Sequence, residues 1–373
     1  MRVLFWGELF WPYVGGPEQL SMRLLPALRE LGHEFIVITS HHDRALPDRD
    51  SLDGIPIYRF PFRDALHRRD AKALTATRER VADVVTSFSP AMVHMGAFGP
   101  SALVYLMTPA ARTMPLLATV QHQLLPASHG PNSLLGRLLD ASSWVRTVSR
   151  SVLLELRERK PELATRSSVI YSFVESTEPA SAAPAPFESP VVLCLGRLIA
   201  DKGFDVAIRA FGDVLEAFPN ARLVVAGDGV CRDALQTLAA TAGISGRVTF
   251  SGWVEPGAVR DMMNRATLVL LPSRREGLPM VAIQAAFAQR PIVAANVGGM
   301  SEVVLHGRTG LLAPPGDEDA LARAVCALLR DPERARGLAA AARAHALERF
   351  SKARCVASFD GLYRRLSPTP AKA

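Results

Sequence analysis

The sequence is 373 residues long, with 49% hydrophobic and 21% charged residues, which is an ordinary composition for a folded protein. A chain of this length suits two domains, and no apolar run reaches the roughly 18 to 20 residues that a membrane-spanning helix requires. The 43 basic and 36 acidic residues give a net charge of +7, which favours anionic ligands or surfaces. The anionic partner could be nucleic acid, an anionic membrane surface or a phosphorylated substrate. Because no basic block contains interleaved aromatic residues, nucleic acid is the least favoured of the three.

The cysteines and the first residues of the sequence indicate the cellular compartment of the protein. Four cysteines lie far apart, without any C-x-x-C pair, at Cys194, Cys231, Cys326 and Cys355. This spacing fits buried thiols in a reducing compartment and argues against structural zinc or a disulfide framework. The opening run 1–7 has no small-residue cleavage site, so it predicts a first strand and not a signal peptide. We therefore expect a cytoplasmic protein.

The N-terminal half begins with a strand–loop–helix–strand pattern, which is a βαβ unit. Its loop ends in Gly15 and Gly16 directly before the helix, where bare backbone lets a ligand approach free N–H groups. A plain turn is the competing interpretation of this glycine pair. The predicted elements of this half are strands 2–9, 34–40, 91–95, 115–121, 144–149 and 168–173, and helices 18–31 and 100–111.

Two polar clusters in this half have some features of metal sites. Asp48-Arg49-Asp50 has a D-x-D pattern, but it lies in a loop rich in Pro and Asp with no strand leading into it. His41-His42 follow a predicted strand, but no third ligand can be identified for them. Solvated loops explain both clusters better, so we expect no metal.

Residues 62–87 predict one amphipathic helix that carries many basic side chains. One interpretation, which we prefer, is a solvated helix face packed on the sheet. The other is a patch for an anionic membrane, worth roughly 1 kcal/mol per basic side chain near the surface. The basic residues are Arg63, His67, Arg68, Arg69, Lys72, Arg78 and Arg80.

His122 stands at the carboxyl end of the predicted strand 115–121. A single histidine usually has a structural role, but this one faces the edge at which open α/β sheets bind ligands. The two interpretations carry equal weight on the residues alone.

A Pro-, Ala- and Ser-rich run over 175–190 cannot sustain a strand or a helix and predicts an interdomain linker. Beyond it the alternation of strands and helices restarts, which predicts an α/β fold of two doubly wound domains with a cleft between them. The predicted elements are strands 191–195, 222–226, 247–251, 267–271, 291–296 and 310–313, and helices 204–217, 231–242, 256–265, 279–289, 317–330 and 332–350.

The domain limits follow from these elements. We place them at 1–175, a linker at 176–190, 191–350, and a terminal crossover helix and tail at 351–373. Three apolar residues of the last helix are expected to pack back across the hinge, namely Val356, Phe359 and Tyr363.

Three loops at strand ends of the second half are expected to converge. Gly196–Gly203 carries Arg197 and Lys202 ahead of a helix, Gly227–Gly229 follows the next strand, and Glu276 lies between strand 267–271 and a helix. Two cations, glycine-lined backbone and a helix N-terminus suit a diphosphate, because Arg grips phosphate oxygens bidentately and Lys is a compact charge. The competing interpretation is a surface pair of cations near Asp201.

Several motifs in chain order resemble one family. They are P-x-x-G-G-x-E (12–18), G-H-E (32–34), T-V-x-H (119–122), G-R-L-x-x-x-K-G (196–203), E-G-x-P (276–279), G-G-M-S-E (298–302) and H-G-R-T-G-L-L (306–312). Together they are similar to the retaining glycosyltransferases of family 4, which have the GT-B fold. The resemblance covers nearly the whole chain and is specific for family and fold, not for substrate.

The resemblance implies roles for individual residues. Arg197 and Lys202 would hold the donor diphosphate, Glu276 a hydroxyl of the donor sugar, and His122 would lie against the sugar near the anomeric carbon. Backbone contacts to the donor would come from Gly15, Gly16, Gly229, Val254, Gly277, Leu278, Met280 and Val281.

The implied chemistry explains these residue types. The sugar leaves as an oxocarbenium-like species while the departing diphosphate gains negative charge, which fixed cations and N–H dipoles stabilise. No protein nucleophile, metal or cofactor is required, because the leaving phosphate can accept the incoming hydroxyl's proton on the same face. Closure of the interdomain cleft would bring donor and acceptor together.

The sequence departs from the family pattern at three places. Gln284 stands where the second Glu of E-x7-E holds the nucleotide ribose, so the charge there is lost. Gly96 stands where a second His is common, and 171–173 replaces an N-G pair near the hinge.

We therefore expect a nucleotide diphosphate sugar as donor, with UDP favoured over GDP. The acceptor is expected to be a lipid-linked or cell-envelope glycan precursor. The membrane interpretation of the basic helix, the less preferred one above, would place the protein at the inner membrane face. A small soluble acceptor, such as a secondary metabolite, is the alternative. Two rivals remain: a sugar-nucleotide epimerase, and a catalytically weakened nucleotide-sugar-binding protein suggested by Gln284.

Overall fold

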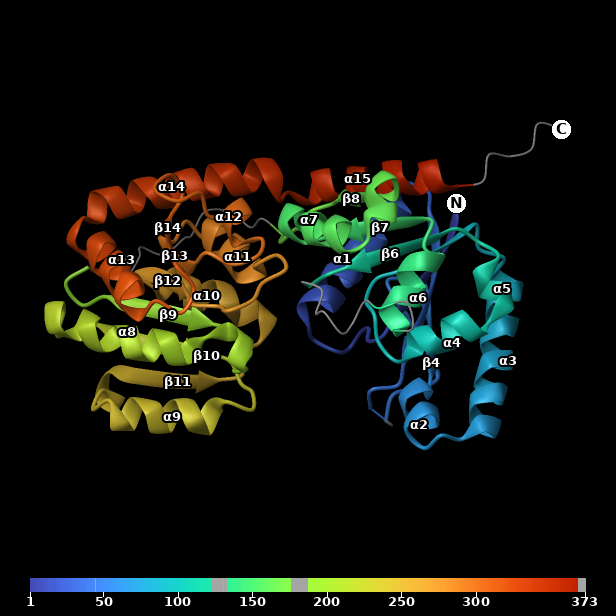
Figure 1. Cartoon of the computed structure of the whole chain (residues 1–373), viewed down its shortest axis with the longest axis horizontal. Coiled ribbons are helices and arrows are strands. Elements are labelled where there is room, and N and C mark those ends of the chain that lie inside the picture. The colour runs from blue at the N-terminus through green and yellow to red at the C-terminus, as the bar shows by residue number, and fades with distance from the viewer. Residues whose placement is uncertain (44, 123–129, 131–132, 176–186, 368–373) are drawn as a thin grey trace. The chain divides into compact units, whose positions relative to one another are not determined.

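The computed structural model describes residues 1–43, 45–122, 130, 133–175 and 187–367 (Figure 1). The chain forms two compact units, Met1–Ser172 with Ala353–Ala373, and Phe173–Lys352. The expected linker, 176–190, falls at the start of the second unit, and most of it lies outside the described residues.

The first unit is built on an eight-stranded sheet in the order β3-β4-β2-β1-β5-β6-β7-β8. All neighbouring strands are parallel except β3, which pairs antiparallel with β4 at one edge. The central strands are mostly apolar and, apart from Arg2, buried, as expected for a parallel sheet covered on both faces. The strands are β1 Arg2–Gly7, β2 Glu34–Ser40, β3 Arg49–Leu52, β4 Ile55–Phe60, β5 Met92–Met95, β6 Leu116–Val120, β7 Trp144–Thr147 and β8 Ser167–Val169.

The helices of this unit follow the alternation with the strands. They are α1 Gly16–Glu30, α2 Phe62–His67, α3 Ala71–Phe88, α4 Ser101–Met107, α5 Pro109–Arg112, α6 Leu134–Ala141, α7 Arg150–Arg159 and α15 Lys352–Leu366, with a 3-10 helix at Pro161–Arg166. The sequence prediction omitted α6 and α7.

The prediction of one helix over 62–87 is wrong. The chain turns between α2 and α3 at Arg69, whose φ of +53° no α-helix accommodates, and Asp70 then caps α3 by accepting from the Ala73 N–H at 2.9 Å. Arg63 pairs with the buried carboxylate of Glu8 at 2.8 Å. The continuous amphipathic pattern therefore conceals a corner between two helices.

Asp48-Arg49-Asp50 was predicted to lie in a loop, but Arg49 and Asp50 begin strand β3, which forms a hairpin with β4. The D-x-D carboxylates are engaged there: Asp48 pairs with His41 at 2.8 Å and Arg80 at 2.9 Å, and Asp50 pairs with Arg59 at 3.0 Å. Hydrogen bonds from Arg80 and then His41 lower the pKa of Asp48. Within the described part of the chain, no three His, Cys, Asp or Glu side chains gather as a metal site.

The prediction that the last helix packs back on the first unit is confirmed. Val356, Phe359 and Tyr363 are buried on α15, the red helix that lies on the unit of the blue and green strands in Figure 1. The Tyr363 hydroxyl lies 2.6 Å from Nδ1 of His94, and burial lowers the pKa of His94 to about 3. The helix is thus held by a neutral, hydrogen-bonded histidine inside an apolar contact.

The second unit has six parallel strands in the order β11-β10-β9-β12-β13-β14. The strands are β9 Val191–Leu195, β10 Arg222–Ala226, β11 Val248–Gly252, β12 Leu268–Leu271, β13 Ile292–Ala295 and β14 Leu311–Ala313, so all six predicted strands are confirmed. The helices are α8 Phe204–Ala217, α9 Arg232–Thr241, α10 Val259–Arg265, α11 Met280–Phe287, α12 Met300–Val303, α13 Glu318–Arg330 and α14 Pro332–Arg349, with 3-10 helices at Ala200–Lys202, Ser245–Arg247 and Pro256–Ala258.

Apolar faces of α8, α9 and α13 share one core with this sheet. The order reverses at β9, since β10 lies on one side of it and β12 on the other. In open α/β sheets such a switch point is where ligands bind, outside the carboxyl ends of the strands. No helix among the described residues is long and apolar enough to cross a membrane.

Candidate active site

Backbone hydrogen bonds join the loops that follow β9, β10 and β12. The Leu198 N–H donates to Asp228 O at 2.8 Å, and the Cys231 N–H donates back to Leu198 O at 2.9 Å. On the other side, the Arg274 N–H donates to Asp201 O at 2.8 Å. The predicted convergence of the three loops is therefore present within the second unit.

Two glycines permit this close approach. Gly203 has a φ of +65°, and a Cβ there would lie 2.1 Å from Pro272 O. Gly298 has a φ of +51°, and its Cβ would lie 1.8 Å from Glu276 O. Any side chain at either position would displace the backbone that carries Glu276.

The loops bring Lys202 and Glu276 into direct contact. The Lys202 Nζ lies 2.6 Å from Glu276 Oε1, and the Ser273 hydroxyl donates to the same oxygen at 2.7 Å. The Lys202 side chain is 24% exposed and that of Glu276 is 11% exposed, so one face of the pair remains accessible. Two donors therefore hold the Glu276 carboxylate in one orientation.

Arg197 differs from Lys202 in its surroundings. It is exposed in the loop after β9, and no hydrogen bond or ion pair holds its side chain among the described residues. Because a guanidinium offers donors in a planar fork, an unpaired Arg197 is available for a phosphate.

A further set of ion pairs fixes the loop that precedes Glu276. The Arg274 guanidinium binds both oxygens of Asp205, at 2.7 and 2.6 Å, and Arg209 donates to Asp205 at 2.8 Å. Arg209 also pairs with Glu318 at the start of α13. The hydrogen bond from Arg274 lowers the pKa of Asp205 to about 2. The sequence did not predict a role for Arg274, Asp205, Arg209, Glu318 or Ser273, because the family motifs assign none to them.

The start of α11 supplies free N–H groups beside Glu276. Pro279 precedes its first turn, which contains Met280 and Val281, and the first N–H groups of a helix have no partner inside it. Gln284 lies one turn further and is half-buried. The predicted helix start is confirmed to within a residue.

The remaining predicted donor contacts of this unit lie on the same edge. Gly229 and Val254 are half-buried in the loops after β10 and β11, while Gly277 and Leu278 are buried directly before α11.

Three predicted site residues belong to the first unit. Gly15 precedes α1, and a Cβ there would lie 2.2 Å from a carboxylate oxygen of Glu18, whereas a Cβ at Gly16 would meet nothing within 4 Å. Gly16 is thus the open position of the pair. His122 is exposed two residues beyond β6.

The structure explains why glycine occupies position 96. A Cβ at Gly96 would lie 2.3 Å from Cζ of Phe5, so the phenyl ring fills the space that a side chain would need. The Gly96 carbonyl accepts from the Gln121 amide at 2.6 Å, next to His122.

Two family models match the chain in succession. "Glycosyltransferase Family 4" matches residues 14–178, and "Glycosyl transferases group 1" matches residues 178–345. The chain belongs to the family 4 glycosyltransferases. Each model covers one of the two predicted domains, as the motifs in both halves implied.

Curated relatives match this glycosyltransferase over different shares of their length. The alpha-D-kanosaminyltransferase of Streptomyces kanamyceticus is 32% identical over 48% of this chain and 46% of that protein. A GDP-mannose-dependent phosphatidylinositol monomannoside mannosyltransferase of Mycolicibacterium smegmatis is 34% identical over 44% of each. An uncharacterized glycosyltransferase of Methanocaldococcus jannaschii is 26% identical over 86% of this chain and 88% of its own. The matches to the first two thus span less than half of those proteins.

Solved structures share the GT-B fold. Sucrose-phosphate synthase of Thermosynechococcus elongatus has a TM-score of 0.82 at 21% identity, covering 98% of this chain and 99% of its own. HepE of Anabaena, solved in complex with UDP-glucose, has a TM-score of 0.76 at 19% identity, covering 98% and 100%. At such identities the likeness concerns the fold alone.

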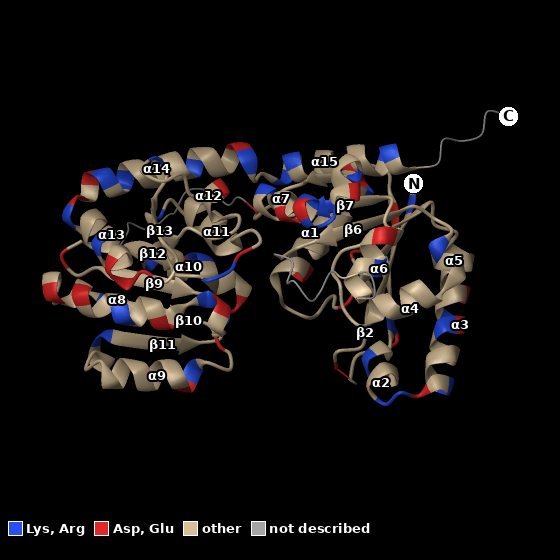
Figure 2. Ribbon diagram, in the orientation of Figure 1, with Lys and Arg blue, Asp and Glu red and all other residues tan. Residues whose placement is uncertain are grey.

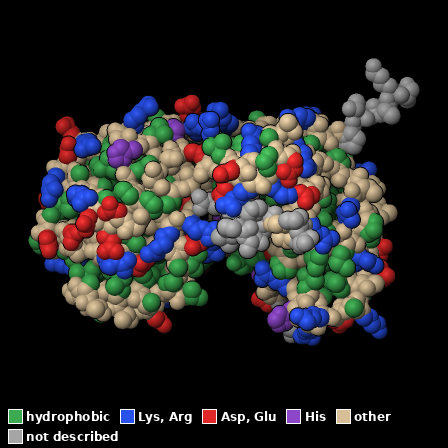
Figure 3. Space-filling model, in the orientation of Figure 1, with side chains coloured by type: hydrophobic (Ala, Val, Ile, Leu, Met, Phe, Trp, Pro, Cys, Tyr) green, Lys and Arg blue, Asp and Glu red, His purple; other side chains and the backbone are tan. Residues whose placement is uncertain are grey.

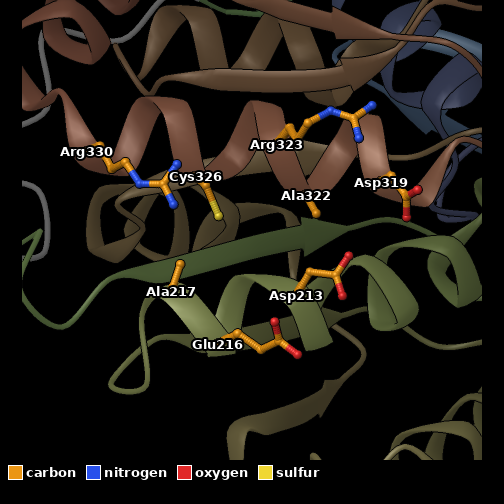
Figure 4. A pocket seen from close by; sticks show the side chains of 8 residues that line it. All are labelled: Asp213, Glu216, Ala217, Asp319, Ala322, Arg323, Cys326 and Arg330. Atoms are coloured by element: carbon orange, nitrogen blue, oxygen red, sulfur yellow. The ribbon is translucent and has the colours of Figure 1, made fainter.

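A separate groove of about 800 Å³ lies between α8 and α13 (Figure 4). Ala217, Ala322 and Cys326 line it together with Asp213, Glu216, Asp319, Arg323 and Arg330. It contains none of the predicted site residues, so we do not assign the sugar site to it.

Proposed function

We propose that this glycosyltransferase moves a sugar from a nucleotide diphosphate sugar to an acceptor hydroxyl, with retention at the anomeric carbon and without metal. The observation that supports this best is the Lys202–Glu276 pair, 2.6 Å apart, beside the unpaired Arg197 at the ligand-binding edge of the second sheet. Cations and an oriented carboxylate there match a donor that carries both a diphosphate and a sugar.

In this proposal each group acts on a defined part of the donor. Arg197 and Lys202 neutralise the charge that develops on the leaving diphosphate, together with the first N–H groups of α11. Glu276, fixed by Ser273, accepts a hydrogen bond from a sugar hydroxyl and so orients the anomeric carbon. His122 and the Gly16 backbone stay the donor contacts predicted for the first unit. The diphosphate accepts the proton of the incoming hydroxyl, so no protein nucleophile is needed.

The proposed donor is a UDP-sugar in preference to a GDP-sugar. HepE, which shares the fold, was solved with UDP-glucose, while the mycobacterial relative uses GDP-mannose. Gln284 keeps hydrogen-bonding capacity toward the ribose but lacks the charge of Glu.

The proposed acceptor is a lipid-linked or cell-envelope glycan precursor. The mycobacterial relative, a phosphatidylinositol monomannoside mannosyltransferase, supports this choice, and the kanosaminyltransferase of Streptomyces kanamyceticus is also a relative. A small soluble acceptor therefore remains the second candidate. All four cysteines are free, which is compatible with the proposed cytoplasmic location.

The proposed membrane contact uses the corner between α2 and α3. His67, Arg68, Arg69 and Lys72 are exposed there without an ion pair among the described residues, and we call them the basic corner. Figure 2 shows the blue backbone of this turn, and Figure 3 shows basic side chains gathered at that end of the unit. Arg63 and Arg80 form ion pairs with Glu8 and Asp48, respectively, so they are not part of the basic corner.

Replacing Arg68 and Lys72 by glutamine is expected to weaken binding to phosphatidylglycerol vesicles by roughly 30-fold, at about 1 kcal/mol per charge. Cosedimentation would measure this, and binding of the parent protein should fall as salt rises. Arg323→Gln with Arg334→Gln removes the same net charge from the second unit and serves as the control. Equal vesicle binding by both variant pairs would rule out the basic corner.

A donor panel tests the proposed function directly. The protein, without added metal, would be mixed with UDP-, GDP-, ADP- and dTDP-sugars while thermal stability and nucleotide release are followed. We expect one donor to raise the unfolding temperature and to be slowly hydrolysed. Stabilisation without release, even with candidate acceptors present, would favour a nucleotide-sugar-binding protein, and release of an epimerised donor would favour an epimerase.

A further inference from the structure

Two arginines of the first unit are buried to the same extent but have different partners. Arg59 and Arg146 are each 1% exposed. Arg59 pairs with the carboxylate of Asp50 at 3.0 Å, whereas no carboxylate pairs with Arg146 among the described residues. Burial lowers the pKa of Arg146 to about 10, so its guanidinium still carries its charge at neutral pH. Because a buried cation without an anion is unfavourable for folding, stability alone does not explain an arginine at this position.

The Arg146 guanidinium binds the segment by which the chain leaves the first unit. Its Nε donates to Ile170 O at 2.8 Å, and its Nη2 donates to the Ser172 hydroxyl at 3.0 Å. Both acceptors lie beyond the end of β8, and Ser172 is the last residue of this unit before the second unit begins at Phe173. The planar fork of one side chain therefore holds two residues of this segment at once.

The same guanidinium contacts the segment by which the chain returns. The chain re-enters the first unit at Ala353, one residue after α15 begins at Lys352. Phe359 lies about two turns further along α15, and the Arg146 guanidinium carbon is 5.3 Å from the centroid of its ring. Phe359 is itself buried, so water does not separate the two side chains. Arg146 thus contacts both segments that connect the units, and it does so inside the first unit.

We propose that Arg146 is a positioning residue for sugar transfer, because it anchors both segments that connect the two units. The inference rests on the proposed function, in which residues of both units contact the donor. The rate of transfer then depends on how the connecting segments are held, and a displacement of about 1 Å can slow a reaction roughly 100-fold. Ser172 lies within 171–173, where the sequence departs from the family pattern, so no family motif assigns a role to its contact with Arg146.

The test compares two arginines that make the same kind of hydrogen bonds. Arg157 donates to the Ser167 hydroxyl at 3.1 Å and to Ser167 O at 2.8 Å, at the start of β8 and not beyond its end. Arg146→Met is expected to lower kcat for transfer or donor hydrolysis roughly 10- to 100-fold. UDP affinity by calorimetry should stay near that of the parent, because Arg197 and Lys202, the proposed phosphate contacts, belong to the second unit. Arg157→Met should retain both kcat and affinity, and Arg146→Lys should recover part of the loss, since lysine keeps the charge without the planar fork.

Amide hydrogen exchange gives a second readout, which needs no substrate. The amides of 170–173 are expected to exchange roughly 10-fold faster in Arg146→Met than in the parent or in Arg157→Met, because the segment opens more readily without its anchor. Unchanged kcat in Arg146→Met would overturn the inference, as would an equal fall in Arg157→Met, which would indicate general damage to the unit.

Two further outcomes are separable from these. If Arg146→Met does not fold, Ser172→Ala removes one acceptor of Arg146 only, and it should still lower kcat and speed exchange over 170–173. Parent values of both in Ser172→Ala would then overturn the inference. If the parent bound none of UDP, GDP, ADP and dTDP, the proposed function itself would fail, whereas exchange over 170–173 would still show whether Arg146 anchors this segment.

Discussion

Replacing Glu276 by alanine is expected to slow sugar transfer by about 100-fold or more, because it removes a carboxylate positioned at the reacting sugar. The carboxylate is held by Lys202 at 2.6 Å and by Ser273 at 2.7 Å, so two partners fix its orientation. Initial rates of transfer would measure the effect, or rates of donor hydrolysis where no acceptor has been found.

The same substitution should leave nucleotide affinity intact or raise it. Glu276 is proposed to contact the sugar, whereas its charge partly neutralises Lys202, which is proposed to contact the diphosphate. UDP binding by calorimetry separates this outcome from simple unfolding, which would abolish binding as well. Full activity in Glu276→Ala would remove the residue from the mechanism.

Two controls sharpen the comparison. Glu216→Ala removes an exposed glutamate from α8, outside the loops that form the site, and should retain activity. Ser273→Ala keeps the carboxylate but removes the hydrogen bond that orients it. We expect a smaller loss there, expressed in kcat rather than in donor affinity, because only positioning is impaired.

Much of this site was predictable because it depends on local pattern. Apolar strands of four to six residues, each followed by a glycine-containing loop and a helix, specify the βα order of the second unit and the edge where its loops meet. Gly203 and Gly298 have positive φ angles and lie against the backbone of another loop. Only glycine fits such positions, so they are visible in the sequence as glycines.

The missed features depend on partners far apart in the chain. The Arg274–Asp205 pair joins residues 69 positions apart, and the sequence around either residue does not predict the other as its partner. The space at Gly96 is filled by Phe5, which no pattern near position 96 reveals. These contacts form only when distant parts of the chain pack together. The motif therefore predicts the position of Glu276 but not the residues that orient it and its loop.

Two errors in the first unit have local causes. The break at Arg69 uses a positive φ in a residue other than glycine, and the periodicity on both sides of it continues almost unchanged. The edge strand β3 is short and polar, so it carries no alternating apolar signal, although pairing with β4 satisfies its backbone. The assignment of Asp48-Arg49-Asp50 to a loop was wrong because it rested on this polar run.

Replacing Lys202 by alanine is expected to lower transfer by roughly 100- to 1,000-fold, the usual loss when a group that stabilises developing charge is removed. An ammonium–phosphate contact at about 4 Å is worth roughly 4 kcal/mol at an effective dielectric near 20, before desolvation is subtracted. Unlike Glu276→Ala, this change should also weaken UDP and pyrophosphate binding. Lys202→Arg should recover part of the loss, since it keeps the charge but not the compact shape.

The matched control for Lys202 is Arg275→Ala. Arg275 lies next to Glu276 in sequence and is partly exposed, and its guanidinium lies 3.8 Å from Asp201, so this change also removes a cation beside the loop without touching the Lys202–Glu276 pair. Equal losses in the two variants would mean that general charge, and not the position of Lys202, governs donor binding. The salt dependence of UDP affinity should be shallower in Lys202→Ala than in the parent.

The double variant Lys202→Ala with Glu276→Ala distinguishes a coupled pair from two independent groups. Each single change leaves a partly buried charge without its partner, and this cost is absent when both are removed. The combined loss in transfer should therefore be smaller than the product of the single losses, by a coupling of roughly 0.5 to 3 kcal/mol. Strict additivity would mean that the 2.6 Å contact between Lys202 and Glu276 is not maintained in the donor complex.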